Sequence, residues 1–214
     1  SKDVPLSKNI SKNFGKLAPD WPLALCALII TSCSGGFIFG SMTFFIPRYF
    51  EISMLNISTS VFITGLLASL VYALASFSQI GIGWLVDRLS PKKILFFMGL
   101  GQCFFIWLTS VFTDYSLFFI MIMAMCFVFG QIPITDTIIS RYVPDLWRTK
   151  VLSLKFLLNL SVGALVLPIG SKLLQAGFLM AELFFLMSLM SLFIVISAII
   201  LPNQSKAERI DLKL

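Results

Sequence analysis

Six long apolar segments constrain the fold of this chain more than any other feature of its sequence. They cover roughly residues 21–46, 60–83, 94–112, 116–139, 153–174 and 180–201. A helix that crosses the hydrocarbon core of a bilayer needs about 20 mostly apolar residues, and each segment provides about that many. Membrane β-strands are shorter and alternate apolar with polar residues, which these segments do not. The sequence therefore predicts an all-α integral membrane protein with six transmembrane helices.

The composition supports the same class. Of the 214 residues, 58% are hydrophobic and 12% are charged, whereas soluble domains average about 45–50% and about 25%. A soluble domain of this length could not bury so much apolar surface, because it still exposes roughly a quarter to a third of its chain. The excess apolar surface is expected to face lipid, so the lipid bilayer is the first partner of this chain.

Several classes of catalytic and metal site are disfavoured by the residues that are missing. The chain has no histidine, and its four cysteines lie inside apolar segments without a Cys-x-x-Cys pair. Serine and cysteine catalysis with a histidine base, zinc sites and a disulfide framework are therefore not expected. The sequence also lacks a nucleotide-binding glycine-rich loop and the motifs Gly-x-Ser-x-Gly and His-Glu-x-x-His. We expect no enzyme activity, no metal and no cofactor.

The basic residues predict how the chain is oriented. Thirteen of the 16 Lys and Arg residues fall in the two ends and in the two loops on their side. The positive-inside rule places that side in the cytoplasm of a plasma or inner membrane. Residues 1–20 are then a cytoplasmic linker or tail, residues 21–202 the six-span bundle, and residues 203–214 a cytoplasmic tail. The net charge of +6 follows from this topology and does not indicate a nucleic-acid partner.

One loop carries a recognisable motif. Residues 83–93 read Gly83-Trp84-Leu85-Val86-Asp87-Arg88-Leu89-Ser90-Pro91-Lys92-Lys93. This segment resembles the signature loop of the major facilitator superfamily, which lies on the cytoplasmic side between the second and third spans of each six-helix half. Ser90 stands where that pattern usually has Gly, and Pro91 where it usually has a basic residue. The side and the span number both agree with the charge distribution.

A second segment strengthens the resemblance. Residues 142–150, Tyr-Val-Pro-Asp-Leu-Trp-Arg-Thr-Lys, look like the family's cytoplasmic turn after the fourth span. Arg141 departs from the pattern, where an acidic residue is frequent. The resemblance implies a carboxy-terminal half of a twelve-helix fold, and an amino-terminal half of the same polypeptide as its partner. An amino-terminal half is the less favoured alternative.

The resemblance implies transport of a small-molecule substrate by alternating access, driven by an ion gradient or by the gradient of the substrate itself. A membrane receptor or scaffold that retains the fold without transporting is the alternative. Within the signature loop and the following turn, the expected gating residues are Gly83, Asp87, Arg88, Lys92, Lys93 and Arg148. An ordinary hairpin with a positive-inside anchor would also explain the loop.

Two charges within the spans are candidates for substrate or ion coupling. At 1.5 Å per residue, Asp136 lies roughly 12 Å from the centre of the fourth span, with Lys155 at about the same depth in the fifth. A salt bridge between them is geometrically possible, and an unpaired charge there would be costly. Asp136 could exchange Lys155 for a proton or the substrate. Alternatively the pair is structural, or Asp136 meets Arg141 while Lys155 reaches toward the interface.

The neutral polar residues Gln102, Gln131 and Asn159 are further candidates for contacting substrate, although each could equally bond a neighbouring helix. Gly36 and Gly40 form a Gly-x-x-x-Gly pattern, for which close helix packing is the favoured interpretation.

Overall fold

The computed structural model describes residues 21–57 and 60–202 of the chain, which form eight α-helices there. The helices are α1 (Trp21–Ser53), α2 (Val61–Ser76), α3 (Ser78–Arg88), α4 (Pro91–Thr109), α5 (Asp114–Tyr142), α6 (Asp145–Ala164), α7 (Val166–Gln175) and α8 (Met180–Ile200). Because α2 continues into α3 and α6 into α7, they make six helical spans that are long and apolar enough to cross a membrane. The predicted all-α class with six spans is confirmed. The predicted linker 1–20 and tail 203–214 lie outside the described residues.

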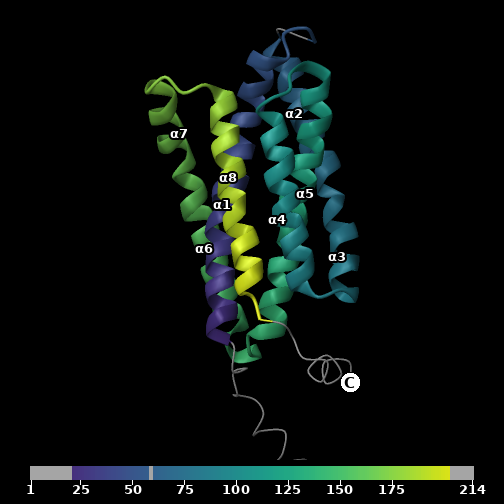
Figure 1. The fold of residues 1–214 in the computed structure, drawn as a ribbon, viewed down its shortest axis with the longest axis vertical. Helices are drawn as coiled ribbons and strands as arrows, with labels where there is room; N and C mark the ends of the chain where they lie inside the picture. The colour runs from purple at the N-terminus through teal and green to yellow at the C-terminus, as the bar shows by residue number, and fades with distance from the viewer. Residues whose placement is uncertain (1–20, 58–59, 203–214) are drawn as a thin grey trace, which may run out of the picture.

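The spans run up and down in one bundle (Figure 1). The beginning of α1 and the end of α8 lie at the same end, which we call the terminal end of the bundle. The turns that join α3 to α4 and α5 to α6 also lie there, and the opposite end is called the far end. An even number of spans requires the first and last helices to begin and end on the same side. The basic residues of these two turns therefore lie at the terminal end, beside the start of α1 and the end of α8.

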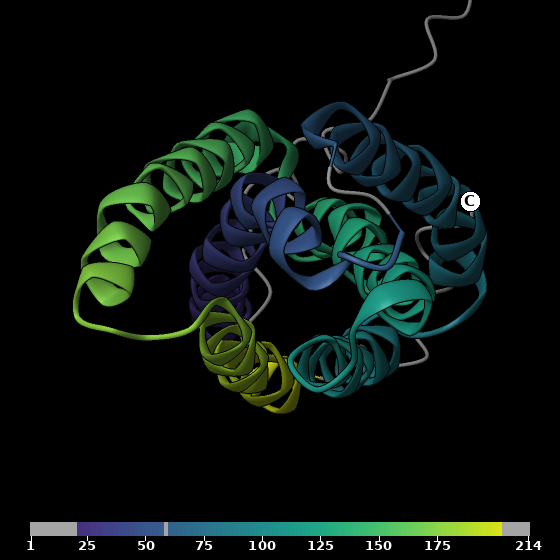
Figure 2. The ribbon, with the colours of Figure 1, turned by 90° about the horizontal axis from the view of Figure 1, so that it is seen from above.

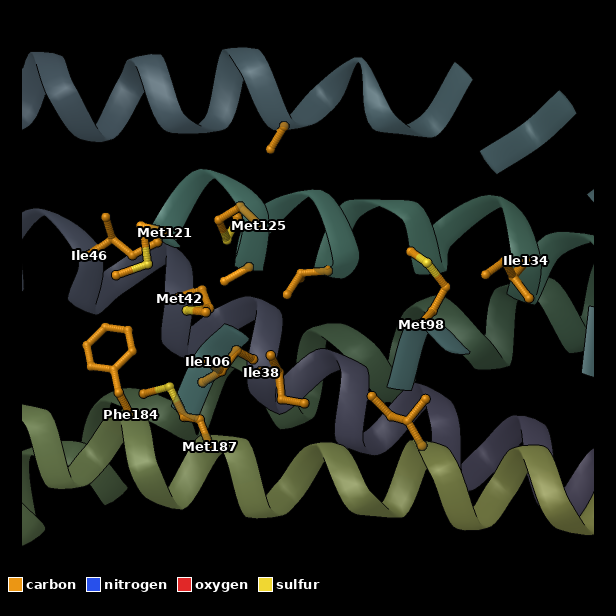
Figure 3. Packing of buried hydrophobic residues seen from close by; sticks show 14 of the residues in the cluster. Ile38, Met42, Ile46, Met98, Ile106, Met121, Met125, Ile134, Phe184 and Met187 are labelled. Atoms are coloured by element: carbon orange, nitrogen blue, oxygen red, sulfur yellow. The ribbon is translucent and has the colours of Figure 1, made fainter. Parts of the chain in front are cut away.

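The centre of the bundle is packed by side chains from α1, α4, α5 and α8 (Figure 3). Fully buried residues there include Ile38, Met42, Ile46, Ile106, Met121, Met125, Ile134 and Phe184. Lipid tails are as apolar as these side chains, so helices associate in a bilayer through close packing and hydrogen bonds. The flexible thioether chains of methionine suit this packing because they fill irregular gaps.

The other two spans lie on one side of this core. Seen from above, α2–α3 and α6–α7 stand on the same side of α1 and α5, and α4 and α8 stand on the opposite side (Figure 2). Both spans expose many large apolar side chains, among them Phe62 and Leu160. Lys155 is the one residue of α6 that is buried in the described structure.

Glycines let α6 approach α1 closely. A Cβ placed on Gly36 would lie 2.7 Å from the carbonyl oxygen of Asn159, and one placed on Gly40 would lie 2.9 Å from the Cα of Gly163. Both distances are shorter than ordinary non-bonded contacts. The packing role predicted for the Gly-x-x-x-Gly pattern is confirmed.

Helix α1 continues beyond residue 46, where the first apolar segment was expected to end, as far as Ser53, and it has Pro47 inside it. Proline cannot donate the backbone hydrogen bond that residue 47 would make to the carbonyl of Thr43. The hydroxyl of Tyr72 in α2 instead donates to that carbonyl at 3.1 Å. A neighbouring helix thus satisfies the acceptor that the proline leaves free, as membrane proteins require.

Two spans are interrupted. Phe77 separates α2 from α3, and Leu165 separates α6 from α7; the backbone N–H of each donates to the carbonyl three residues earlier, at 3.3 Å and 3.1 Å. Pro168 lies one turn after the second interruption and lacks the N–H that would continue the helical ladder. Pro133, by contrast, lies inside α5, which continues to Tyr142.

Candidate functional site

A cavity of about 480 Å³ lies between α1, α5 and α6. Its lining residues recur at helical spacing, so that each helix presents one face to it. From α1 they are Thr31, Ser32, Gly35, Gly36, Phe39, Gly40, Thr43 and Phe44; from α5, Val128, Gln131, Ile132 and Thr135; from α6, Lys155, Phe156, Asn159, Leu160, Gly163 and Ala164. The volume lies within the range of about 300–1,000 Å³ that is usual for small-molecule sites.

The charged pair expected from the sequence is present at this cavity. Lys155 Nζ donates to Asp136 Oδ1 at 2.6 Å. The two side chains are unequally covered: Lys155 is 4% exposed and Asp136 is 46% exposed. Lys155 lines the cavity, whereas Asp136 lies beside the lining residues of α5 without being one of them. The ammonium group is therefore withdrawn from solvent while its partner is still half exposed.

The alternative in which Asp136 meets Arg141 and Lys155 reaches the interface is wrong. Lys155 is buried, and it is paired with Asp136. The Arg141 guanidinium donates to the carbonyl of Val86 at 2.8 Å. The physical reason is position: Lys155 lies about 15 Å along α6 from the start of that helix, too deep to reach the terminal end while its ammonium is held by a carboxylate.

A chain of polar side chains crosses the core behind the cavity. Gln102 in α4 donates to the Gln131 side-chain oxygen at 2.9 Å, and Gln131 in α5 donates to the Thr31 carbonyl at 3.3 Å. The Thr31 hydroxyl shares a hydrogen bond of 2.5 Å with the hydroxyl of Ser197 in α8. All four residues are buried. Four helices are thereby joined by polar contacts, which is a structural role for Gln102.

The three neutral polar residues proposed from the sequence do not all lie at the cavity. Gln131 and Asn159 line the cavity, whereas Gln102 lies behind Gln131 and does not. Asn159 follows Lys155 by four residues, so the two lie on the same face of α6. Ser32 was not among the candidates, yet it lines the cavity and is buried, and its hydroxyl has no hydrogen-bond partner among the described residues. The sequence signal for Ser32 is its position four residues before Gly36, where it extends the Gly-x-x-x-Gly pattern of small residues on α1.

The signature loop lies at the terminal end (Figure 1). A Cβ on Gly83 would meet nothing within 4 Å, so no other described helix approaches α3 at that glycine. Asp87 is exposed, and neither an ion pair nor a hydrogen bond joins its carboxylate to another described residue. The Arg88 guanidinium lies 3.8 Å from the centre of the Trp84 ring. The departure at Pro91 has a local explanation, because Pro91 is the first residue of α4, a position that suits proline; Ser90 is the N-cap of α4, but its side chain makes no capping hydrogen bond.

Basic side chains at the terminal end hold the carboxyl ends of other helices. Lys92 donates to the carbonyl of Ile199 near the end of α8 at 2.9 Å. Arg148 donates to the carbonyl of Ser140 near the end of α5 at 3.0 Å and pairs with Asp145 at 2.7 Å. The last carbonyls of a helix lack partners within the helix and carry partial negative charge, so a cation there is stabilising.

The sequence did not predict these capping contacts, since nothing near Lys92 in the chain indicates α8. Lys93 is exposed and makes no such contact to another described residue.

Within residues 21–57 and 60–202, no three His, Cys, Asp or Glu side chains gather where they could hold a metal ion.

Comparison with known proteins places this geometry in context. A sequence model described as the Major Facilitator Superfamily matches residues 2–166. A search of curated proteins found no match.

Solved structures give the same indication from the fold. The chain is similar to a variant of the E. coli fucose:proton symporter FucP, with a TM-score of 0.68, 18% identity and coverage of 87% of this chain and 44% of that one. It is also similar to FucP in the outward conformation, with a TM-score of 0.68, 16% identity and coverage of 87% and 43%. A third similar structure is a mutant of the peptide transporter POT in complex with alafosfalin. Its TM-score is 0.68 and its sequence identity 16%, and the match covers 88% of this chain and 43% of that one. The chain spans less than half the length of each of these proteins.

Proposed function

The chain belongs to the major facilitator superfamily, and from this premise we propose that it forms one half of a secondary transporter that moves a small solute by alternating access. The observation that carries the proposal is the cavity between α1, α5 and α6, which contains a buried ammonium in its wall. An ionisable group at membrane depth is costly and is usually retained for binding or coupling.

The second half is proposed to be six further spans of the same polypeptide, encoded upstream of Ser1. The chain covers 43–44% of the similar transporters. The two spans on the uncovered side, α2–α3 and α6–α7, are the least buried of the six. A second half packed on that side would close the cavity and place the solute near the middle of the bilayer.

The terminal end is proposed to face the cytoplasm, since it carries most of the basic residues. There the signature loop is proposed to act as a gate. The side chains of Asp87 and Lys93 make no hydrogen bond or ion pair with another described residue, so both are proposed to be available to the second half when the cytoplasmic ends close. Lys92 and Arg148 support the gate by holding the ends of α8 and α5. Contacts that exist only in the closed arrangement would shift the equilibrium toward it.

Proton coupling is proposed to pass through Asp136. When Lys155 leaves this carboxylate, a proton is proposed to take the place of the ammonium beside it, since an unpaired charge at that depth is costly. Since Asp136 is 46% exposed, a proton can reach it without entry into the packed core.

Alternating access can be tested without knowing the solute. In full-length protein whose native cysteines are replaced by serine, Thr43→Cys places a thiol in the cavity ten residues before α1 ends at the far end, and Thr135→Cys places one seven residues before α5 ends at the terminal end. We expect a bulky impermeant maleimide attached at one position to suppress labelling at the other. Thr149→Cys, exposed at the terminal end, reports which side is cytoplasmic.

The alternatives give different results in this assay. Independent labelling of both positions indicates a permanently open pore and contradicts alternating access. Labelling at only one position under all conditions indicates a receptor or scaffold that does not alternate.

A further inference from the structure

The charge of the cavity wall indicates the class of solute. Lys155 is the one residue among the lining residues that carries a formal charge, and the described lining contains neither Asp nor Glu. We propose that the solute is an amphipathic organic monoanion whose carboxylate takes the place of Asp136 on Lys155. This inference rests on the transport function proposed above and names the solute class for the same site.

The ammonium group has unused hydrogen-bonding capacity. Lys155 Nζ has three N–H donors, and among the described residues Asp136 Oδ1 is the acceptor it reaches. A buried donor without an acceptor costs free energy. A second carboxylate entering the cavity would supply acceptors for the remaining donors before the first bond is broken.

The unequal covering of the pair makes the exchange feasible. A charge left alone in a low-dielectric site is strongly unfavourable. Because Lys155 is 4% exposed and Asp136 is 46% exposed, loss of its partner is more costly for the ammonium than for the carboxylate. The site therefore favours exchange of one anion for another on Lys155 over separation of the two charges.

The rest of the wall fits the other part of the solute. Phe39, Phe44, Ile132, Phe156 and Leu160 give the cavity a largely apolar lining. The buried, unpartnered hydroxyl of Ser32 offers one hydrogen bond to a polar group on the solute body. The single cation that this half contributes matches one carboxylate, and a cavity of about 480 Å³ suits a small molecule.

The test uses full-length protein in lipid nanodiscs and matched radiolabelled probes that differ in the head group. One set is 4-phenylbutyrate, 4-phenylbutyramide and 4-phenylbutylamine, and a second set is octanoate, octanamide and octylamine. Empty nanodiscs correct for partition into lipid. We expect the carboxylate of at least one set to bind about tenfold more tightly than its amide, which corresponds to one charge-assisted contact, and the amine to bind most weakly.

Variants of the pair separate binding from stability. Asp136→Asn removes the competing carboxylate and is expected to tighten carboxylate binding severalfold. Lys155→Met is expected to abolish the preference for the carboxylate over the amide, and Lys155→Arg to retain it. If Lys155→Met does not fold, the sign of the Asp136→Asn effect decides.

Three results would overturn the proposal. The first is an amide or amine that binds as tightly as its carboxylate, and the second is weaker carboxylate binding to Asp136→Asn than to wild-type protein. The third is that neither 4-phenylbutyrate nor octanoate binds to either of these two proteins. The accessibility assay with Thr43→Cys and Thr135→Cys needs no ligand, so it reports on the transport function separately. Carboxylate binding without alternation would refute transport and support the anion site. Alternation with a preference for a neutral or cationic solute would refute the anion site alone.

Discussion

Substitution of Gly36 by alanine tests the close contact between α1 and α6, on which the shape of the cavity depends. A Cβ at this position would lie 2.7 Å from the carbonyl oxygen and 2.9 Å from the Cα of Asn159. Carbon atoms in favourable contact lie about 3.5–4.0 Å apart, so the two helices would have to separate by roughly 1 Å. Both of these atoms belong to the backbone, so a change of side-chain rotamer cannot relieve the overlap.

The expected cost follows from two opposing effects. Overpacking of a well-packed interior costs about 1–3 kcal/mol, and replacing glycine with alanine inside a helix returns up to about 1 kcal/mol. We therefore expect Gly36→Ala to destabilise the protein by about 1–2 kcal/mol. Gly65→Ala is the matched control, since it lies inside α2 and its Cβ would meet nothing within 4 Å.

The assay is thermal unfolding of the full-length protein in one detergent, at one scan rate because unfolding of such proteins is often irreversible. For Gly36→Ala we expect a Tm lower by roughly 1–4 °C in a protein about twice the length of this chain, and for Gly65→Ala a Tm equal to or above wild type. A Gly36→Ala protein as stable as the Gly65→Ala protein would refute the close contact. An equal loss in both variants would assign the effect to some other property of helical glycine.

Three further predictions use variants of the full-length protein. Gly83→Ala should leave the Tm unchanged, because a Cβ at this position meets nothing within this half. If the second half approaches at Gly83, the same variant should slow transport turnover. Normal turnover would indicate that the loop is only a positively charged membrane anchor. Lys92→Met should lower stability by about 1 kcal/mol through loss of its bond to α8, whereas Lys93→Met should not, and equal Tm values would contradict the capping role. Asp136→Asn should insert into the membrane normally and, in proteoliposomes, retain solute exchange while losing proton-driven accumulation. If Asp136→Asn instead reduces expression, and adding Lys155→Met restores it, the pair is structural.

Features that depend on length and depth along a helix could be predicted from the sequence. Each span was recognisable because its apolar segment matches the bilayer. The pairing of Asp136 with Lys155 was predictable as a possibility, because a fixed rise per residue gives the depth of each side chain on adjacent spans. The sequence did not predict which member of the pair is buried, and the structure shows that it is Lys155.

Features that depend on contacts between distant segments could not be predicted. Tyr72 satisfies the carbonyl that Pro47 leaves free, and nothing local to the proline indicates that a tyrosine in the next span will do so. The hydrogen bond between Thr31 and Ser197 joins residues 166 positions apart. The interruption at Phe77 also lacks a local cause, because no proline lies in α2 or α3.

The distribution of polar contacts indicates which part of this half can move. The buried polar chain joins α1, α4, α5 and α8. In the described structure, by contrast, two polar contacts join α6–α7 to other helices: Arg148 with the carbonyl of Ser140, and Lys155 with Asp136. Segments with few buried contacts open at lower free energy than the core. A solute that takes Lys155 from Asp136 removes one of these two contacts, and the interruption at Leu165 lies ten residues beyond that lysine. If a solute exchanges partners with Lys155 as proposed above, we expect α6–α7, the least buried of the six spans, to move more readily than α1, α4, α5 and α8.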